Sequence, residues 1–95
     1  MQITGIYWLP AIIDKLIDKH QVEIHEVEEV LSGHARFRRI QRGRVQGEHL
    51  YSALGQTDAG RYLIVFFIRK PTDIALVISA RDMNDHEQRR FRRTK

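Results

Sequence analysis

The chain has 95 residues, no cysteine and a formal net charge of +4. This length fits one small domain spanning residues 1–95, and the missing cysteines exclude disulfide scaffolds, thiolate metal sites and cysteine nucleophiles. No apolar stretch is long enough to span a membrane, and the first residues lack the pattern of a signal peptide, so we expect a cytoplasmic protein.

The positive charge is concentrated in two blocks. Residues 32–47 contain five arginines and no acid, and residues 89–95 contain five bases and no acid. The rest of the chain is slightly acidic. Because arginine is suited to bidentate contact with phosphate, such blocks predict nucleic acid or an acidic protein as a partner. The alternative is a solubilising surface with a frayed tail.

Two helices are predicted in the first third of the chain. Apolar residues recur at three- and four-residue spacing from Trp8 to Lys19, which is typical of an amphipathic helix, and Pro10 suits its first turn. A second helix is predicted from about Glu23 to Leu31, with Gly33 placed to end it. A short strand before Trp8 is a further option.

The hydrophobic period then changes to that of strands. Residues 35–42 alternate loosely among arginines and predict a polar strand, and Glu48 to Leu54 predicts the next one. Tyr62 to Ile68 and Ile74 to Ala80 are apolar on both faces, which is typical of central strands. Short turns join these strands.

The last predicted element is a helix from Asn84 to about Arg93, where Asn84 and Glu87 have the spacing of a capping box. Phe91 is nearly its only large apolar residue, so we expect this helix to be mostly exposed or docked on a partner. The order of elements predicts an α+β fold. Two N-terminal helices would precede an antiparallel sheet of three or four strands, and the C-terminal helix would follow it. The helices are expected to pack on one face of this sheet.

A set of short motifs runs through these elements. They are Trp8 with Lys19-His20, Glu48 with Leu54-Gly55, Gly60-Arg61, Arg69, Ile78-Ser79-Ala80-Arg81, and Glu87 with Phe91. Together they resemble the BrnT toxins, small ribonucleases of bacterial type II toxin–antitoxin pairs whose fold is similar to that of RelE-type toxins. The resemblance covers nearly the whole chain.

The chain departs from the family's pattern on its first helix. Leu9, Ile12 and Leu16 stand where the family usually has Asp, Lys and Asn. This apolar surface favours an alternative function, in which the chain is a degenerate toxin that binds RNA or protein without catalysis.

The resemblance implies an endoribonuclease toxin inhibited by a cognate DNA-binding antitoxin, with a toxin–antitoxin heterotetramer as one assembly that it allows. RNA supplies its own nucleophile, the ribose 2′-OH. The histidines lack the spacing of a metal site, so we predict cleavage without a metal or other cofactor.

Such cleavage needs a base, an acid and cations that stabilise the charge on the phosphorane. His20 is the candidate acid or base, because histidine titrates near neutrality; alternatively it meets the dipole of its helix. Glu48 is a candidate base or orienting carboxylate, or else an ordinary strand-edge carboxylate. Arg81 is the candidate catalytic cation, aimed by the end of an apolar strand, or else an ion-pair partner of Asp82, Asp85 or Glu87.

The remaining cations are candidates for RNA binding. Lys19 would bind phosphate or serve as a solvated helix-end cation. Arg61 and Arg69 lie at opposite ends of one strand, so one of them is expected to be structural. Alternation along the polar strand predicts that four of its arginine side chains point to the same face of the sheet, namely Arg36, Arg38, Arg42 and Arg44. That face would track RNA or dock an acidic antitoxin segment, or it would only protect a charged edge strand from aggregation.

Overall fold

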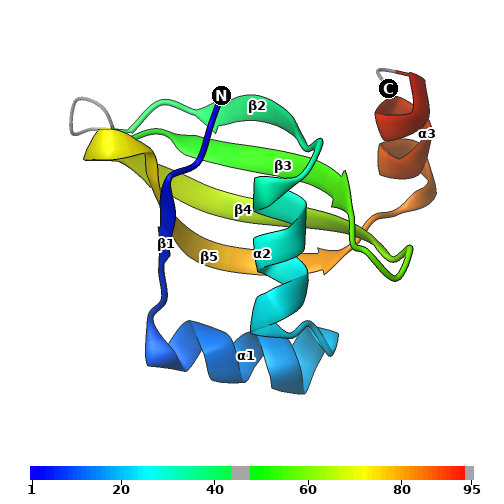
Figure 1. The fold of residues 1–95 in the computed structure, drawn as a ribbon, viewed down its shortest axis with the longest axis horizontal. Coiled ribbons are helices and arrows are strands. Elements are labelled where there is room, and N and C mark those ends of the chain that lie inside the picture. The colour runs from blue at the N-terminus through cyan, green and yellow to red at the C-terminus, as the bar shows by residue number, and fades with distance from the viewer. Residues whose placement is uncertain (44–47, 94–95) are drawn as a thin grey trace.

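A five-stranded sheet and three α-helices make up the part of the chain that the structure describes, residues 1–43 and 48–93 (Figure 1). The structure is a computed structural model. In chain order the elements are β1 (Gly5–Tyr7), α1 (Pro10–His20), α2 (Ile24–Ser32), β2 (Arg36–Gln41), β3 (Leu50–Gln56), β4 (Tyr62–Lys70), the 3₁₀ helix η1 (Pro71–Asp73), β5 (Ile74–Asp82) and α3 (Asp85–Arg93). None of these helices is long and apolar enough to cross a membrane.

The helices and strands predicted from periodicity are confirmed, with ends that differ by at most two residues. Gln21, with a φ of 51°, ends α1 in the left-handed region, and its N–H donates to the carbonyl of Ile17. At the start of α3, Asn84 and Glu87 form the predicted capping box, each backbone N–H donating to the other's side chain at 2.9 and 2.8 Å.

The sheet is larger than predicted, and it is mixed. Its strands lie in the order β1-β5-β4-β3-β2, with β2 to β5 antiparallel to their neighbours. The short strand β1 is parallel to β5, with Gly5 opposite Ile74 and Tyr7 opposite Leu76. The prediction of an antiparallel sheet of three or four strands is therefore wrong at this edge. A three-residue strand has no measurable period, and only its packing sets its direction.

The larger part of the core lies between the sheet and the first two helices. Figure 1 shows α2 crossing the sheet and α1 running along its β5 side. Leu16 of α1 and Val27 of α2 pack with Leu63, Val65 and Phe67 of β4, and all five side chains are buried. The amphipathic faces of both helices are thus used in the core.

The third helix packs on the opposite face, so the prediction that the helices share one face is wrong. Phe91 is buried with Leu54, Ile64 and Met83, and its ring meets that of Tyr62 edge-on at 6.1 Å. The single apolar side chain of α3 therefore docks the helix on its own sheet. The sequence holds the physical reason, because a strand that is apolar on both faces needs cover on both.

Candidate nucleic-acid interface

The sheet face that α3 partly covers is lined by arginines, and strand register determines which ones. Arg38 lies opposite Ser52 on β3, and Ser52 lies opposite Phe66 on β4. Arg81 on β5 lies opposite Ile64. Paired residues point to the same face of a sheet, so arginines from β2 and β5 meet over the side chains of β3 and β4.

A β-bulge sets the direction of Arg81. The pairing of β5 with β4 is regular except between Val77 and Ser79, where Ile78 is an extra residue. An extra residue reverses the alternation of side chains. Val77 therefore points into the core, whereas Ser79 and Arg81 point to the opposite face. Without the bulge, alternation would turn Arg81 toward the helices α1 and α2.

These arginines line a hollow of about 390 Å³ on the sheet face. Its lining consists of Arg38, Arg39, Ile40, Ser52, Ile64, Phe66, Arg81, Glu87 and Arg90. Four cations and one carboxylate thus surround a partly apolar floor. A cationic hollow with an aromatic side chain suits a polyanion that carries flat bases.

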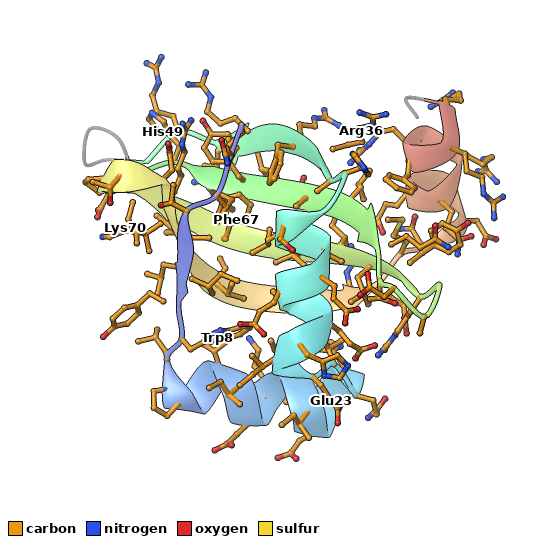
Figure 2. The ribbon with its side chains drawn as sticks, in the orientation of Figure 1. Trp8, Glu23, Arg36, His49, Phe67 and Lys70 are labelled. Atoms are coloured by element: carbon orange, nitrogen blue, oxygen red, sulfur yellow. The ribbon has the colours of Figure 1, made fainter. Side chains whose placement is uncertain are left out.

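A second hollow, of about 230 Å³, shares Arg38 and Arg90 with the first and is also lined by Arg36. Figure 2 shows Arg36 beside α3. The Nε of Arg36 is buried and has no hydrogen-bond partner among the residues that the structure describes. Buried donors are nearly always paired, so this N–H is a candidate contact for an anion such as phosphate.

Glu87 holds Arg81 in place at the rim of the hollow. The two terminal nitrogens of Arg81 donate to the two carboxylate oxygens of Glu87 at 2.8 and 2.9 Å, and the guanidinium lies 5.6 Å from the centre of the Phe66 ring. The hydrogen bonds from Arg81 lower the pKa of Glu87, and the same contact raises the pKa of Arg81. Arg81 is therefore a fixed cation, and its ion-pair partner is Glu87.

Arg61 joins the ends of three elements on the other side of the sheet. Its guanidinium donates to the carboxylate of Asp82 at 2.7 and 3.3 Å and to that of Glu26 at 3.0 Å. It also donates to the carbonyls of Gln21 at 2.7 Å and His20 at 3.0 Å. Five hydrogen bonds within the chain give Arg61 a structural role at the junction of α1, α2 and β5.

The three residues predicted to be catalytic lie in three different places. Arg81 lines the hollow, and His20 ends α1 beside Arg61. Glu48 pairs with Lys70, which Figure 2 shows at the far end of the sheet. Lys70 lies six residues along β4 from the partner of Arg81, which corresponds to roughly 20 Å. The structure therefore brings only Arg81 to the arginine-lined hollow.

The cations predicted to bind RNA are also dispersed. Arg36 and Arg38 share the sheet face, but Arg42 lies beyond the end of β2, and a bulge between Arg39 and Gln41 interrupts the alternation. Arg44 lies outside the described residues. The four-arginine row is therefore confirmed only for its first two members.

The last two cations of that prediction lie away from the hollow. Lys19 is exposed near the end of α1. Arg69 pairs with Asp73 at 2.6 Å, at the end of β4 that lies farther from Arg81.

Two of the three apolar departures at α1, Leu16 and Ile12, serve packing. Leu16 is 1% exposed in the core, Ile12 packs against the same cluster, and Leu9 remains 38% exposed. In the described part of the chain, no three His, Asp or Glu side chains gather in a way that could hold a metal ion.

Sequence reasoning missed three of the charged and aromatic residues of the hollow, Arg39, Phe66 and Arg90. Phe66 was hidden inside an apolar run, although alternation along β4 separates it from its buried neighbours Val65 and Phe67. Arg90 belongs to the C-terminal basic block and lies three residues after Glu87, on the same side of α3. Helix spacing was therefore the signal that could have identified it.

Comparison with known proteins agrees with this fold. Residues 8–87 match the family described as the ribonuclease toxin BrnT of type II toxin–antitoxin systems. The crystal structure of the Brucella abortus ribonuclease toxin BrnT is similar, with a TM-score of 0.61 and 20% sequence identity. The match covers 85% of this chain and 97% of that one, and at this identity it shows a shared fold. A search of curated proteins found no match.

Proposed function

We propose that this chain, which belongs to the family of BrnT ribonuclease toxins of type II toxin–antitoxin systems, cleaves RNA at the arginine-lined hollow of its sheet. The family implies an RNA substrate and an antitoxin partner. The observation that carries the location is the convergence of Arg38, Arg81 and Arg90 beside the Phe66 ring. The reaction takes place in the cytoplasm, where the substrate is, and the antitoxin inhibits it.

The chemistry that suits this hollow is electrostatic. The ribose 2′-OH of the substrate loses its proton to a base and attacks the adjacent phosphorus; the bond from phosphorus to the 5′-oxygen breaks, and this oxygen leaves with a proton from an acid. Because RNA supplies the nucleophile, neither a protein nucleophile nor a metal is needed. Arg81, held by Glu87, stabilises the charge that develops on the phosphorane, because a preorganised cation costs little reorganisation during the reaction. Arg36 and Arg38 bind neighbouring phosphates, and Phe66 offers a surface on which a base stacks.

Proton transfer is the smaller contribution in this proposal. Glu87 is the carboxylate in the lining, and its lowered pKa keeps it ionised but makes it a weak base. His20 and Glu48 remain candidates for the acid and base, but each would have to reach a substrate that extends beyond the hollow. Catalysis would then depend more on Arg81 than on either of them.

The test compares RNA cleavage by purified variants. Arg81→Gln should lower the cleavage rate about 10²- to 10³-fold, whereas Arg69→Gln, which changes an arginine paired at the other end of β4, should cleave like the wild type. Circular dichroism shows whether both variants are folded. A folded Arg81→Gln variant that cleaves at the wild-type rate would refute the proposed location.

Two further results would redirect the proposal. If His20→Ala abolishes cleavage while Arg81→Gln does not, the reaction takes place at the end of α1. If the wild type binds RNA without cleaving it, the chain is a binding module on the toxin fold, the function favoured by the apolar departures on α1.

A further inference from the structure

A hollow on the helix-covered side of the molecule lies between the N-terminal segment and the C-terminal half of α2. Its volume is about 290 Å³, and its lining includes Ile3, Ile6, Trp8, Glu28, Leu31 and Ser32. It shares no residue with the arginine-lined hollow on the opposite face of the sheet. A ligand bound here would therefore occupy a site separate from the one proposed for RNA.

Trp8 brings a buried hydrogen-bond donor to this hollow. Figure 2 shows Trp8 in the space enclosed by β1, α1 and α2. Its indole Nε1 has no hydrogen-bond partner within residues 1–43 and 48–93. Because buried tryptophan N–H groups usually have a partner, a ligand that completes the site would offer this donor an acceptor, such as a carbonyl oxygen.

Glu28 brings an exposed carboxylate to the rim of the same hollow. Its two nearest glutamates on α2 are engaged elsewhere. Glu26 pairs with Arg61, and Glu29 accepts the backbone N–H of Asp58. The carboxylate of Glu28, in contrast, has no partner in the part of the chain that the structure describes. It is therefore available to a cation that enters the hollow.

The end of α2 adds to the negative potential at this place. Ser32 is the last residue of the helix, and its last turn contains no basic residue. Carbonyls at a helix C-terminus carry a partial negative charge that favours cations. Residues 1–31 also contain two lysines against six acids. These surroundings favour a ligand with a cation and a neutral acceptor over one with a carboxylate or a phosphate.

We infer that this hollow binds one basic residue of a peptide chain, an arginine or a lysine. Its charged group would pair with Glu28, and its backbone carbonyl would accept from Nε1 of Trp8. Its methylene stem would pack on Ile3, Ile6 and Leu31, because such stems lie along apolar surfaces while their charged heads stay near water. The hollow has room for about one residue, since sites for whole small molecules start near roughly 300 Å³.

The experiment titrates the full chain with N-acetyl-argininamide, which is a single arginine residue with blocked ends. Trp8 is the only tryptophan of the sequence, so its indole N–H gives one signal in a nitrogen–proton correlation NMR spectrum. This signal should move downfield as the ligand accepts the hydrogen bond. A ligand of about 15 non-hydrogen atoms should bind with a Kd on the order of 1 mM. N-acetyl-citrullinamide, which has nearly the same shape without the charge, should bind roughly fivefold more weakly.

Three variants test the assignment of the groups. Glu28→Gln should weaken binding of N-acetyl-argininamide roughly fivefold, as expected for an ion pair at an exposed rim, and should abolish the preference over the citrulline derivative. Asp18→Asn is the matched control, because it removes an exposed acid of α1 that does not line the hollow, and it should change neither. Trp8→Phe removes the donor and should also weaken binding, which the backbone amide signal of Ser32 reports. Circular dichroism shows whether each variant is folded.

Four outcomes would overturn the inference. They are an indole signal that does not move at millimolar N-acetyl-argininamide, equal binding of the citrulline derivative, a folded Glu28→Gln variant that binds like the wild type, and tighter binding of acetate than of N-acetyl-argininamide. A blocked tripeptide with arginine in the middle should bind at least as tightly as the single residue. If it does not bind, the ligand is not part of a peptide chain.

The titrations contain no RNA, and Arg81→Gln should bind N-acetyl-argininamide like the wild type. A chain that fails to cleave RNA would therefore refute the proposed function and leave this inference to be decided by binding alone.

Discussion

Arg61 offers the sharpest test of how this fold is held together. The variant Arg61→Ala removes the cation that pairs with Glu26, whose side chain is only 16% exposed. It also removes the donors to the carbonyls of His20 and Gln21 at the end of α1. Hydrogen bonds to a charged group contribute about 1.5–3 kcal/mol each. The pair with Asp82, whose side chain is 63% exposed, adds less than about 1 kcal/mol. We expect a total loss of about 3 kcal/mol, since the carbonyls can partly turn to water.

Thermal unfolding followed by circular dichroism measures this loss. For a domain of this size, about 3 kcal/mol lowers Tm by roughly 12–24 °C. Arg69→Ala is the control at the other end of β4, since its pair with Asp73 is a half-exposed i,i+4 contact worth less than about 1 kcal/mol. Arg61→Lys should fall between the two, because lysine keeps the charge without the fork of donors. Equal Tm values for Arg61→Ala and Arg69→Ala would show that Arg61 is a surface cation, and RNA binding would again be its best explanation.

Three further predictions concern packing and pH. Gly55→Ala should lower the free energy of unfolding in urea by about 1–3 kcal/mol, because the new Cβ would lie 2.7 Å from Val30 Cγ1; an unchanged midpoint would contradict this. Phe91→Ala should cost about 3–5 kcal/mol and detach α3, which trypsin digestion of the helix would reveal, whereas Phe91→Leu should keep the helix docked. Arginine partners lower the pKa of Glu87 and of Asp82 below their ordinary values of 4.5 and 3.8. These two ion pairs therefore add their full stability above the ordinary pKa values, and this stability is lost as the pH falls through the lowered pKa values of the folded protein. Acid unfolding of Glu87→Gln should therefore be less steep below about pH 4.5 than that of the wild type.

Local patterns predicted the elements of this fold well, because each depends on neighbouring residues. The amphipathic period gave α1 and α2, and the run of apolar residues on both faces marked β4 and β5 as central strands. The place of α3 was missed although its signal was present. Phe91 alone is a weak amphipathic pattern, but it suffices when the strand beneath the helix needs cover on its second face.

The candidate site was less predictable, because it depends on contacts between distant residues. Arg81 was identified from the sequence and lines the hollow. His20 and Glu48 were grouped with it by chemistry, but register and helix packing separate them. Phe66 lies on β4 and Arg90 on α3, and no pattern of neighbouring residues predicts that these two elements pack together.

The bulge at Ile78 explains why the adjacent residues Arg81 and Asp82 make contacts on the faces that they do. Asp82 points to the side of α1 and binds Arg61, while Arg81 points to the hollow and binds Glu87. Because the bulge lies before both residues, one extra residue in β5 sets both contacts at once. If β5 kept Ile78 but paired without the bulge, Arg81 and Asp82 would exchange faces and a guanidinium would be buried in the core, whereas deletion of Ile78 would leave both residues on their present faces. A variant at Asp82 therefore reports on the junction of the helices, and only a variant at Arg81 reports on the hollow.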